Sequence, residues 1–464
     1  MRDAGNVPAP RVAVVGAGIA GLSAAHTLAT SGAGLEVVVL ESSPRVGGKL
    51  LLGEVAGQAV DLGAEAMLNR RPEAVALARA VGLADDVCHP ATSRAAVWTR
   101  DAVRPLPPTV MGVPTDLGAL RRSGIMSRTG LARAWLERLL PRRAVAEDMS
   151  VGDFVARRFG REVVDRLVEP LLGGVYAGTS FDLSLRAAAP QIAALPQMSS
   201  VGNGHTPVFA GIRGGVGRLA EQVASASGAL IRTDATVREL VRGRTWELVV
   251  GSTRDPELLT ADAVVLATPA PATARLLISV SSVAASSELQ HIQYASTAVI
   301  TLAVPASALP RPLTGSGFLV PPVDGQSIKA ATFSSVKWRW LGEALGDGVV
   351  VMRASIGRLG EEKVLQREDA ELVALAVSDL AAAVGLAGPP LDAVVTRWGG
   401  GLPQYTVGHR ERVTRIRSAV ALLPSLEVCG AAYDGIGVAA CVADGQGAAD
   451  RLLASLGTPG TMKT

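Results

Sequence analysis

Hydrophobic residues near the start of the chain follow the pattern of a strand, a helix and a second strand. Residues 12–15 are β-branched or small and uncharged, as expected of a strand that is buried on both faces of a parallel sheet. Residues 22–30 are predicted to form a helix, and residues 36–40 form a second apolar run that ends before Glu41. The chain is therefore predicted to open with a β-α-β unit.

Two later segments repeat this α/β character. The first contains strand-like runs at 229–233, 236–241, 246–250 and 263–266. The second combines a strand-like run at 426–430 with a segment rich in Ala and Gly at 435–453, whose small side chains let a helix lie close to a sheet or a ligand. We predict one discontinuous Rossmann-like domain made of residues 8–80, 208–270 and 394–458.

The intervening residues differ in pattern. Residues 115–207 are helical and basic, and we predict a helical insertion domain there. Strand-like runs at 298–304 and 348–352 indicate a mixed sheet in a substrate-binding domain, which we place at residues 81–114 and 271–393. The predicted fold class is α/β.

Composition narrows the functional classes. The chain has 464 residues, 45 basic and 42 acidic side chains and a formal net charge of +3, a balance that argues against a nucleic-acid partner. The uncharged run 12–29 could be mistaken for a signal peptide or a membrane span, but its glycines and the strand that follows argue against both. We expect a cytoplasmic protein without an integral membrane segment.

Cysteine and histidine are too sparse for several kinds of site. The three cysteines lack CxxC spacing and the five histidines are scattered, so we expect no disulfide framework and no metal site. The chain also lacks the signature of a nucleophile elbow, and we assign no catalytic acid, base or nucleophile.

The glycines after the first strand carry the clearest chemical signal. Gly16, Gly18 and Gly21 have GxGxxG spacing, which permits a tight turn, lets the backbone approach a pyrophosphate and lets the helix pack against the strand. Glu41 stands about twenty residues later, where its carboxylate can accept a ribose hydroxyl and disfavours a 2′-phosphate. The unit predicts dinucleotide binding, and the alternative is a Rossmann-like unit that binds nothing.

Further turns resemble the flavoprotein oxidases of the amine-oxidase superfamily. The sequence Arg45-Val46-Gly47-Gly48-Lys49 is similar to the turn that backs the FAD pyrophosphate in that superfamily. The sequence Gly63-Ala64-Glu65-Ala66 is similar to the turn that approaches the isoalloxazine ring. The resemblance implies FAD as the cofactor.

Three longer blocks resemble the porphyrinogen oxidases, the flavoenzymes of haem biosynthesis. They are the segments 169–178, 397–409 (Arg-Trp through Pro-Gln-Tyr to Gly-His) and 429–438. The resemblance spans nearly the whole chain. Departures occur at Ala64, where relatives often have proline, at Thr179, where an acid is usual, and at 439–440, where proline and acid are frequent.

Carried over position by position, the resemblance implies FAD contacts at a defined set of residues. These are Gly16, Ala17, Gly18, Ile19, Ala20, Gly21, Glu41, Ser42, Arg45, Gly48, Lys49, Gly63, Ala64, Glu65, Ala66, Val237, Trp398, Ile436, Gly437 and Val438. For Trp398 and Tyr405, ordinary core packing is an equal alternative.

The resemblance also implies a substrate. Related soluble enzymes from Gram-positive bacteria oxidise coproporphyrinogen III to coproporphyrin III with dioxygen, and we expect that reaction here, with protoporphyrinogen IX as the alternative substrate. Gly174 and Tyr176 are expected to line the substrate site. Arg70 and Arg71 are candidates for pairing with propionates, against the alternative of solvated arginines.

Other classes of function are compatible with the same fold. An amine oxidase or a carotenoid desaturase has the same fold, and escort proteins of small GTPases share it without a flavin. The insertion also carries seven arginines among apolar residues: Arg121, Arg122, Arg128, Arg133, Arg138, Arg142 and Arg143. That region could contact a membrane surface or a ferrochelatase that receives the product, and a solvated helix is the alternative.

Overall fold

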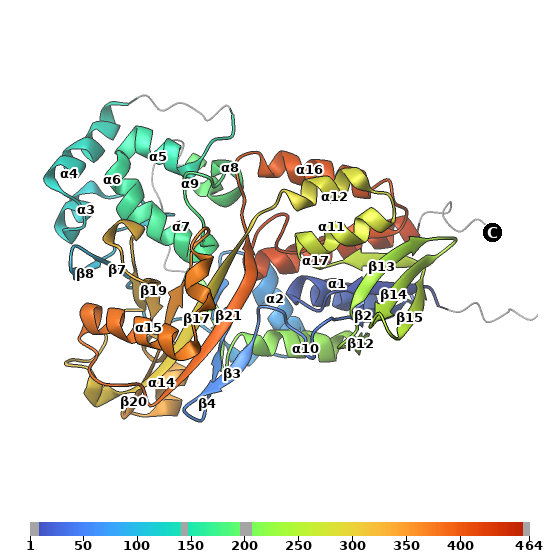
Figure 1. The fold of residues 1–464 in the computed structure, drawn as a ribbon, viewed down its shortest axis with the longest axis horizontal. Coiled ribbons are helices and arrows are strands. Elements are labelled where there is room, and N and C mark those ends of the chain that lie inside the picture. Colours follow the sequence, from blue (N-terminus) through green and yellow to red (C-terminus); the bar gives the residue numbers. More distant parts are fainter. Residues whose placement is uncertain (1–8, 141–146, 195–206, 458–464) are drawn as a thin grey trace, which may run out of the picture.

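A five-stranded parallel sheet forms the nucleotide-binding half of the molecule. The computed structural model describes residues 9–140, 147–194 and 207–457. The strands lie in the order β12 (Leu230–Arg232), β2 (Glu36–Leu40), β1 (Arg11–Val15), β16 (Ala263–Leu266) and β22 (Leu426–Val428), and all neighbours are parallel. Strands from three distant parts of the chain thus pair in one sheet (Figure 1).

Alternate side chains of this sheet enter two different cores. Val12 and Val14 of β1 pack against the helices on one face: α1 (Ile19–Thr30), α2 (Pro72–Ala80), α10 (Gly217–Ser227) and α17 (Val438–Leu456). Ala13 and Val15 face the opposite layer. This layer consists of β13 (Val237–Arg242), β14 (Trp246–Gly251), β15 (Pro256–Ala261), α11 (Ala270–Ser279), α12 (Val283–Gln290) and α16 (His409–Val420). Burial on both faces explains why β1 carries no charge beyond its first residue.

A seven-stranded mixed sheet forms the second half. Its order is β21 (Asp392–Pro403), β17 (Tyr294–Pro305), β20 (Val349–Ile356), β19 (Ile328–Thr332), β18 (Gly317–Leu319), β7 (Ala96–Thr99) and β8 (Ala102–Pro105). Only the β18–β7 pair of this sheet is parallel. Leu372, Ala376 and Leu380 of α15 (Asp369–Val384) pack on one face of this sheet. The opposite face is turned toward the five-stranded half.

Helices gather in a third region, at the upper left of Figure 1. They are α3 (Leu117–Ser123), α4 (Arg128–Trp135), α5 (Val151–Phe159), α6 (Arg161–Val163), a π-helical turn (Val164–Val168), α7 (Glu169–Tyr176), α8 (Leu185–Ala188) and α9 (Pro190–Ala194). Asp116, Ser127 and Ser150 cap α3, α4 and α5 with their side-chain oxygens. These helices share one apolar core that includes Leu167, Leu172 and Tyr405.

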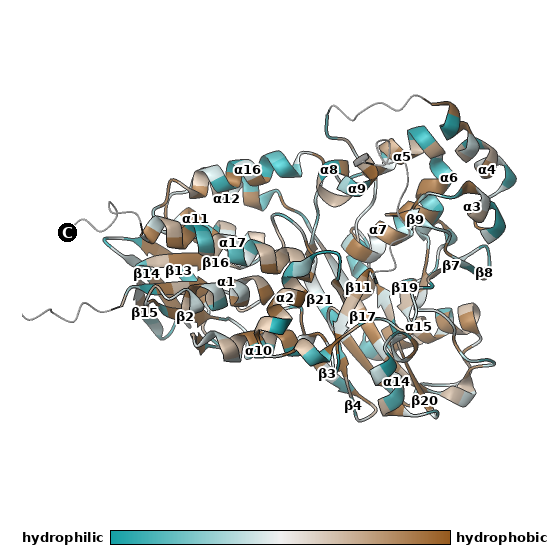
Figure 2. Ribbon diagram, turned by 180° about the vertical axis from the view of Figure 1, so that it is seen from behind, coloured by the Kyte–Doolittle hydropathy of each residue, from teal (hydrophilic) through white to brown (hydrophobic). Residues whose placement is uncertain are grey.

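Short elements complete the fold. They are β3 (Leu52–Val55), β4 (Gln58–Asp61), β5 (Met67–Leu68), β6 (Val87–Cys88), β9 (Thr109–Val110), β10 (Val113–Pro114), β11 (Phe209–Ile212), α13 (Ser334–Lys337) and α14 (Arg339–Leu345). Figure 2 shows hydrophilic residues along α16, on the outside of the molecule. Within the described ranges, no helix is both long and apolar enough to cross a membrane.

The structure confirms the predicted α/β class and refines several elements. The strand predicted at 298–304 extends over Tyr294–Pro305, and the strand predicted at 348–352 is Val349–Ile356. The predicted domain limit at 394 falls inside β21, whose hydrogen bonds to β17 place it in the seven-stranded sheet. The domain limits themselves stay a prediction.

Candidate functional site

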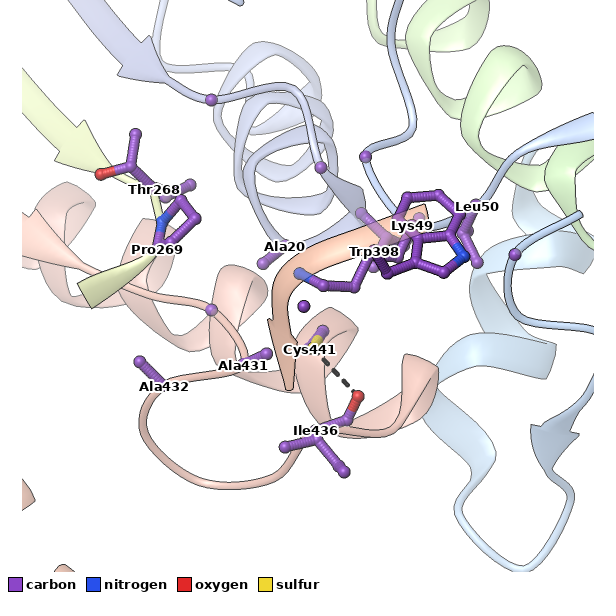
Figure 3. Close-up of a pocket in the computed structure, with 18 of the residues that line it drawn as sticks. Ala20, Lys49, Leu50, Thr268, Pro269, Trp398, Ala431, Ala432, Ile436 and Cys441 are labelled. Carbon is purple, nitrogen blue, oxygen red and sulfur yellow. Dashed lines mark hydrogen bonds between the residues drawn. The ribbon is translucent and has the colours of Figure 1, made fainter. Parts of the chain in front are cut away.

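A cavity of about 730 Å³ lies between the two large sheets. One end is formed by the carboxyl ends of β1, β2 and β16, and the other by the face of the seven-stranded sheet opposite α15, together with α7. Figure 3 shows its middle part, where Lys49 and Trp398 lie beside Cys441 and Ile436 at the start of α17. Its volume lies in the usual range of small-molecule sites.

The three glycines after β1 meet different surroundings. A Cβ on Gly21 would lie 1.9 Å from the Gly16 carbonyl oxygen, so this residue must be glycine for α1 to start against the strand. Gly16 has φ +103° and lies against the Ala267 carbonyl. A Cβ on Gly18 would meet no atom within 4 Å, and Gly18 lines the cavity. The open space at Gly18 is where a ligand can approach the backbone most closely.

Gly47 and Gly48 pack against the glycine loop, and both line the cavity. Gly47 donates its N–H to the Ala17 carbonyl at 2.8 Å, and a Cβ on Gly48 would lie 3.2 Å from the Gly18 Cα. The Arg45 guanidinium donates to the carbonyls of Val46 and Gly48. Arg45 therefore holds its own turn and does not line the cavity.

Glu41 fixes the end of β2 against the glycine loop. Its Oε2 accepts the Ala17 N–H at 2.8 Å, and its Oε1 accepts the Ser43 N–H at 2.8 Å. Glu41 and Ser42 both line the cavity, whereas Ala17 and Gly21 do not. Since Ala17 donates to Glu41, its N–H is not available to a phosphate.

The turn at Gly63 is packed between Lys49 and Trp398. A Cβ on Gly63 would lie 2.0 Å from the Lys49 carbonyl and 3.2 Å from the Trp398 ring. Gly63, Ala64 and Ala66 line the cavity, as do Lys49 and Trp398. Burial lowers the pKa of Lys49.

Glu65, for which the resemblance implies an FAD contact, has its side chain behind this turn and does not line the cavity. Its carboxylate accepts from Arg353 Nη1 at 3.0 Å and from the Trp338 indole, and it lies 3.7 Å from Lys337 Nζ. Burial acts to raise the pKa of Glu65, but Lys337, Arg353 and Trp338 outweigh it and lower the pKa. The side chain points away from the cavity because its cationic partners come from β20 and α13.

The start of α17 supplies the wall opposite the turn. Ile436, Gly437 and Val438 line the cavity, and no side chain caps this helix. Its unpaired N–H groups and the positive end of its dipole favour a partial negative charge in the cavity. Burial raises the pKa of Cys441 to about 12, so this thiol is not a nucleophile at neutral pH.

Side chains of the block 397–409 form hydrogen bonds to the backbone of neighbouring elements. Gln404 Nε2 donates to the Tyr176 carbonyl at 2.7 Å. The Tyr405 hydroxyl donates to the Ala431 carbonyl at 2.7 Å and accepts the Gly435 N–H at 2.8 Å. The block thereby joins β21 to α7 and to the loop before α17. Trp398 lines the cavity, and Tyr405 is buried in the core.

Of the residues expected to bind the substrate, some line the cavity and others do not. Gly174 lines the cavity together with Val175. Tyr176 does not: its hydroxyl donates to the Ala188 carbonyl and its ring lies 5.7 Å from that of Tyr405. Arg71 also lies outside the lining, where its guanidinium pairs with Glu73 at 3.0 Å.

Several lining residues were not predicted from the sequence. The described lining includes Thr297 and Val299 on β17, Lys329 on β19, Ser355 on β20 and Arg275 on α11. The period-two pattern of β17 could have indicated one face of a strand. Lys329 stands out as the one charge in an apolar run from 328 to 333.

The structure describes five of the seven arginines of the insertion. Arg133 donates to the carbonyls of Arg157 and Arg158, and Arg138 lies 4.5 Å from the Trp135 ring centroid. Trp135, Leu136 and Leu139 are exposed. Arg142 and Arg143 lie outside the described residues.

No group of His, Cys, Asp and Glu within the described ranges could hold a metal ion.

The sequence matches known proteins over almost its entire length. The coproporphyrinogen III oxidase of Mycobacterium tuberculosis is 38% identical over 461 residues, covering 96% of each chain. That of Bacillus subtilis is 30% identical over 475 residues, covering 96% of this chain and 98% of the relative.

Solved structures agree in fold. A structure from Exiguobacterium sp. 255-15, described as a protoporphyrinogen oxidase, superposes with a TM-score of 0.84 at 28% identity, covering 96% of this chain and 99% of that one. Cyclohexylamine oxidase from Brevibacterium oxydans has a TM-score of 0.70 at 16% identity, covering 97% and 100%, a likeness of fold alone. The family model described as flavin containing amine oxidoreductase matches residues 19–453. The chain therefore belongs to the family of flavin containing amine oxidoreductases, as the resemblance of its sequence implied.

Proposed function

We propose that the protein oxidises coproporphyrinogen III to coproporphyrin III, with FAD as its cofactor and dioxygen as the electron acceptor. The names and the end-to-end similarity of the mycobacterial and Bacillus relatives support this substrate. The observation that carries the proposal is the shape of the cavity. One cavity is lined both by the glycine loop and, at its other end, by residues of α7 and the seven-stranded sheet, and its wall is largely apolar.

The residues present fit an FAD molecule. Two helices that no side chain caps, α1 and α17, begin at the cavity, and their N–H groups suit the pyrophosphate and the flavin carbonyls. The open space at Gly18 leaves room for the pyrophosphate. Val237 and Glu41 line the cavity and would suit the adenine and its ribose, and Trp398 with Lys49 would border the flavin.

The far chamber suits a flat, apolar macrocycle. Val175 from α7 and Val299 from β17 supply apolar walls, and Gly174 leaves space between them. A porphyrinogen has this apolar body and carries carboxylates on its rim. Exclusion of water by such walls strengthens electrostatic contacts to the carboxylates.

The contribution of the protein to the reaction is to position the substrate against the cofactor. Bound FAD supplies the capacity to accept hydride from a bridging carbon of the substrate. The residues of the chain hold the two reactants in contact and keep water out. The Gly63 turn, held by Arg353, and the loop before α17, held by Tyr405, fix two walls of the cavity relative to each other.

The decisive experiment compares substrates directly. Purified protein with bound flavin should show absorbance near the flavin bands and should form coproporphyrin III from coproporphyrinogen III with consumption of dioxygen. Turnover of protoporphyrinogen IX is measured side by side. A clear preference for protoporphyrinogen IX, or colourless protein, would reject the proposal.

Protoporphyrinogen IX is the second candidate, for a specific reason. The structural relative from Exiguobacterium is described as a protoporphyrinogen oxidase, and a rice chloroplastic protoporphyrinogen oxidase is 28% identical over 446 residues. The relatives named for coproporphyrinogen reach higher identity, which favours the tetracarboxylate.

The proposal extends to the cellular setting. We place the reaction in the cytoplasm, with transfer of the product to a ferrochelatase. The exposed apolar residues near Trp135 are the surface on which a partner or a membrane would be tested first. Sedimentation with liposomes, and with a ferrochelatase, measures both contacts.

A further inference from the structure

Lys329 is a buried lysine in the wall of the cavity that none of the roles described above explains. Its relative exposure is 3%, and it lines the cavity together with Thr297, Val299 and Ser355. Lysine is almost never fully buried unless it is paired. Its position therefore requires a physical reason.

The register of the sheet places Lys329 on the cavity face. Ile328 and Ala331 of β19 belong to the core that α15 covers. The pairing with β20 is irregular between Ile328 and Ala330, so one extra residue is accommodated at Lys329. Bulges of this kind re-aim a side chain. Lys329 consequently lies on the face of the sheet that is turned away from α15.

Within the described ranges, no hydrogen bond or ion pair involves the Lys329 ammonium. The charged groups on the elements around β19 have partners of their own. Asp379 on α15 accepts the Ile328 N–H, Glu169 on α7 accepts the Ser180 N–H, and Arg353 on β20 pairs with Glu65. Arg358 and Glu361, which follow β20, pair with each other at 3.5 Å. Among the described residues, Lys329 thus faces the cavity with no carboxylate in hydrogen-bond or ion-pair contact.

We propose that Lys329 binds a carboxylate of the substrate and thereby favours the tetracarboxylate porphyrinogen over the dicarboxylate one. Resting on the proposed function, this inference adds a residue that selects among porphyrinogens. Lys329 lines a cavity whose wall is largely apolar, and there an anion on the rim of the macrocycle would supply the missing partner. A charged hydrogen bond there is stronger than at the surface.

The protonation of Lys329 links this contact to pH. Burial, and then the nearby Arg358, lowers the pKa of Lys329 to about 7, with Glu361 acting in the opposite direction. Without a bound carboxylate, the Lys329 side chain is thus partly neutral at physiological pH. A bound carboxylate favours the ammonium, so binding draws a proton onto Lys329, and affinity falls as the pH rises above 7.

The test measures equilibrium binding of the product coproporphyrin III to the flavin-loaded protein, by quenching of porphyrin fluorescence between pH 6 and 9. The variants are Lys329→Met, which keeps the length without the charge, and Lys329→Arg, which keeps the charge at every pH used. Lys363→Met, at an exposed lysine, is the matched control. The coproporphyrin tetramethyl ester and protoporphyrin IX are the comparison ligands.

We expect Lys329→Met to weaken the binding of coproporphyrin III about tenfold to a hundredfold. The binding of protoporphyrin IX should weaken less, and that of the tetramethyl ester should not change. The fall in affinity with pH should disappear in both Lys329 variants, with Lys329→Arg still binding tightly. Flavin content and Tm equal to those of the original chain show that the cavity is intact. Unchanged affinity and pH profile in Lys329→Met would overturn the inference while leaving the proposed function in place. Failure of the original chain to bind coproporphyrin III would instead reject the proposed function, and the inference with it.

Discussion

Arg353 and Glu65 form a buried ion pair of 3.0 Å directly behind the turn that lines the cavity. Their side chains are 9% and 11% exposed. The second terminal nitrogen of Arg353 donates to the Gly63 carbonyl at 2.6 Å. A charge pair at the back of the turn thus sets the position of the backbone at its front.

Replacement of Arg353 by Met should therefore destabilise the protein and loosen the turn. Glu65 would keep only Lys337 and Trp338 as partners, and removal of one member of a buried pair costs about 3–5 kcal/mol. We expect a lower Tm and a lower flavin content after purification. Thermal unfolding followed by circular dichroism, together with flavin absorbance, measures the two effects.

The double variant Arg353→Met with Glu65→Gln separates charge from geometry. Since it removes both charges of the Arg353–Glu65 pair, and Lys337 keeps its contact with the Trp338 ring at 5.0 Å, it should recover part of the Tm that the single variant loses. Flavin affinity should stay low, because the bond to the Gly63 carbonyl is still absent. A double variant with a Tm as low as that of the single variant would show that the charge is not the cause.

The two glycines Gly18 and Gly21 should respond differently to substitution by Ala. At Gly18 the new methyl group enters open cavity space, so folding is expected to be unaffected and FAD affinity to fall at least tenfold. At Gly21 the methyl group would lie 1.9 Å from a backbone oxygen, so the protein itself is expected to lose stability. Titration of flavin-depleted protein with FAD and measurement of Tm distinguish the two. Equal FAD affinity in Gly18→Ala and the original chain would contradict this assignment.

How much of the site can be predicted from the sequence depends on how far apart the interacting residues lie along the chain. The glycine loop and Glu41 were recognisable because their roles follow from one β-α-β unit. The direction of the Glu65 side chain could not be predicted, because its partner Arg353 lies 288 positions away and no local pattern shows which way a turn residue points. The sequence likewise could not show that Tyr176 packs against Tyr405, which lies in a distant part of the chain. Lys329 depends on a strand irregularity that only the pairing with β20 shows.

Tyr405→Phe tests the clamp on the loop before α17. The variant keeps the ring in the core but removes the hydroxyl that bonds the Ala431 carbonyl and the Gly435 N–H. Two partly buried backbone groups lose their partner, so we expect a loss of about 1–3 kcal/mol in stability. Catalytic turnover should fall more than substrate affinity, because the loop borders the flavin side of the cavity. The measurement is kcat and KM beside urea unfolding, and a change confined to KM would argue against this role.

His409 should make the stability of the protein depend on pH. Its ring stacks on Tyr405 with centroids 3.9 Å apart, and its Nε2 lies 3.0 Å from the Tyr433 carbonyl. The carbonyl can only accept, so Nε2 carries the proton of the neutral ring. Burial lowers the pKa of His409 to about 4, although its bond to Tyr433 acts in the opposite direction.

The sign of the effect follows from proton binding. Between pH 6.5 and about 4 the unfolded chain binds a proton at this histidine and the folded chain does not, so stability falls as the pH falls through that window. The total contribution is roughly 2 to 4 kcal/mol. Because His409→Gln cannot titrate but retains a donor, its stability should decline less between pH 7 and 4 than that of the original chain. His291→Gln, at an exposed histidine, is the control and should follow the original profile. Parallel pH profiles for His409→Gln and the original chain would show that this ring is not what makes the fold sensitive to acid.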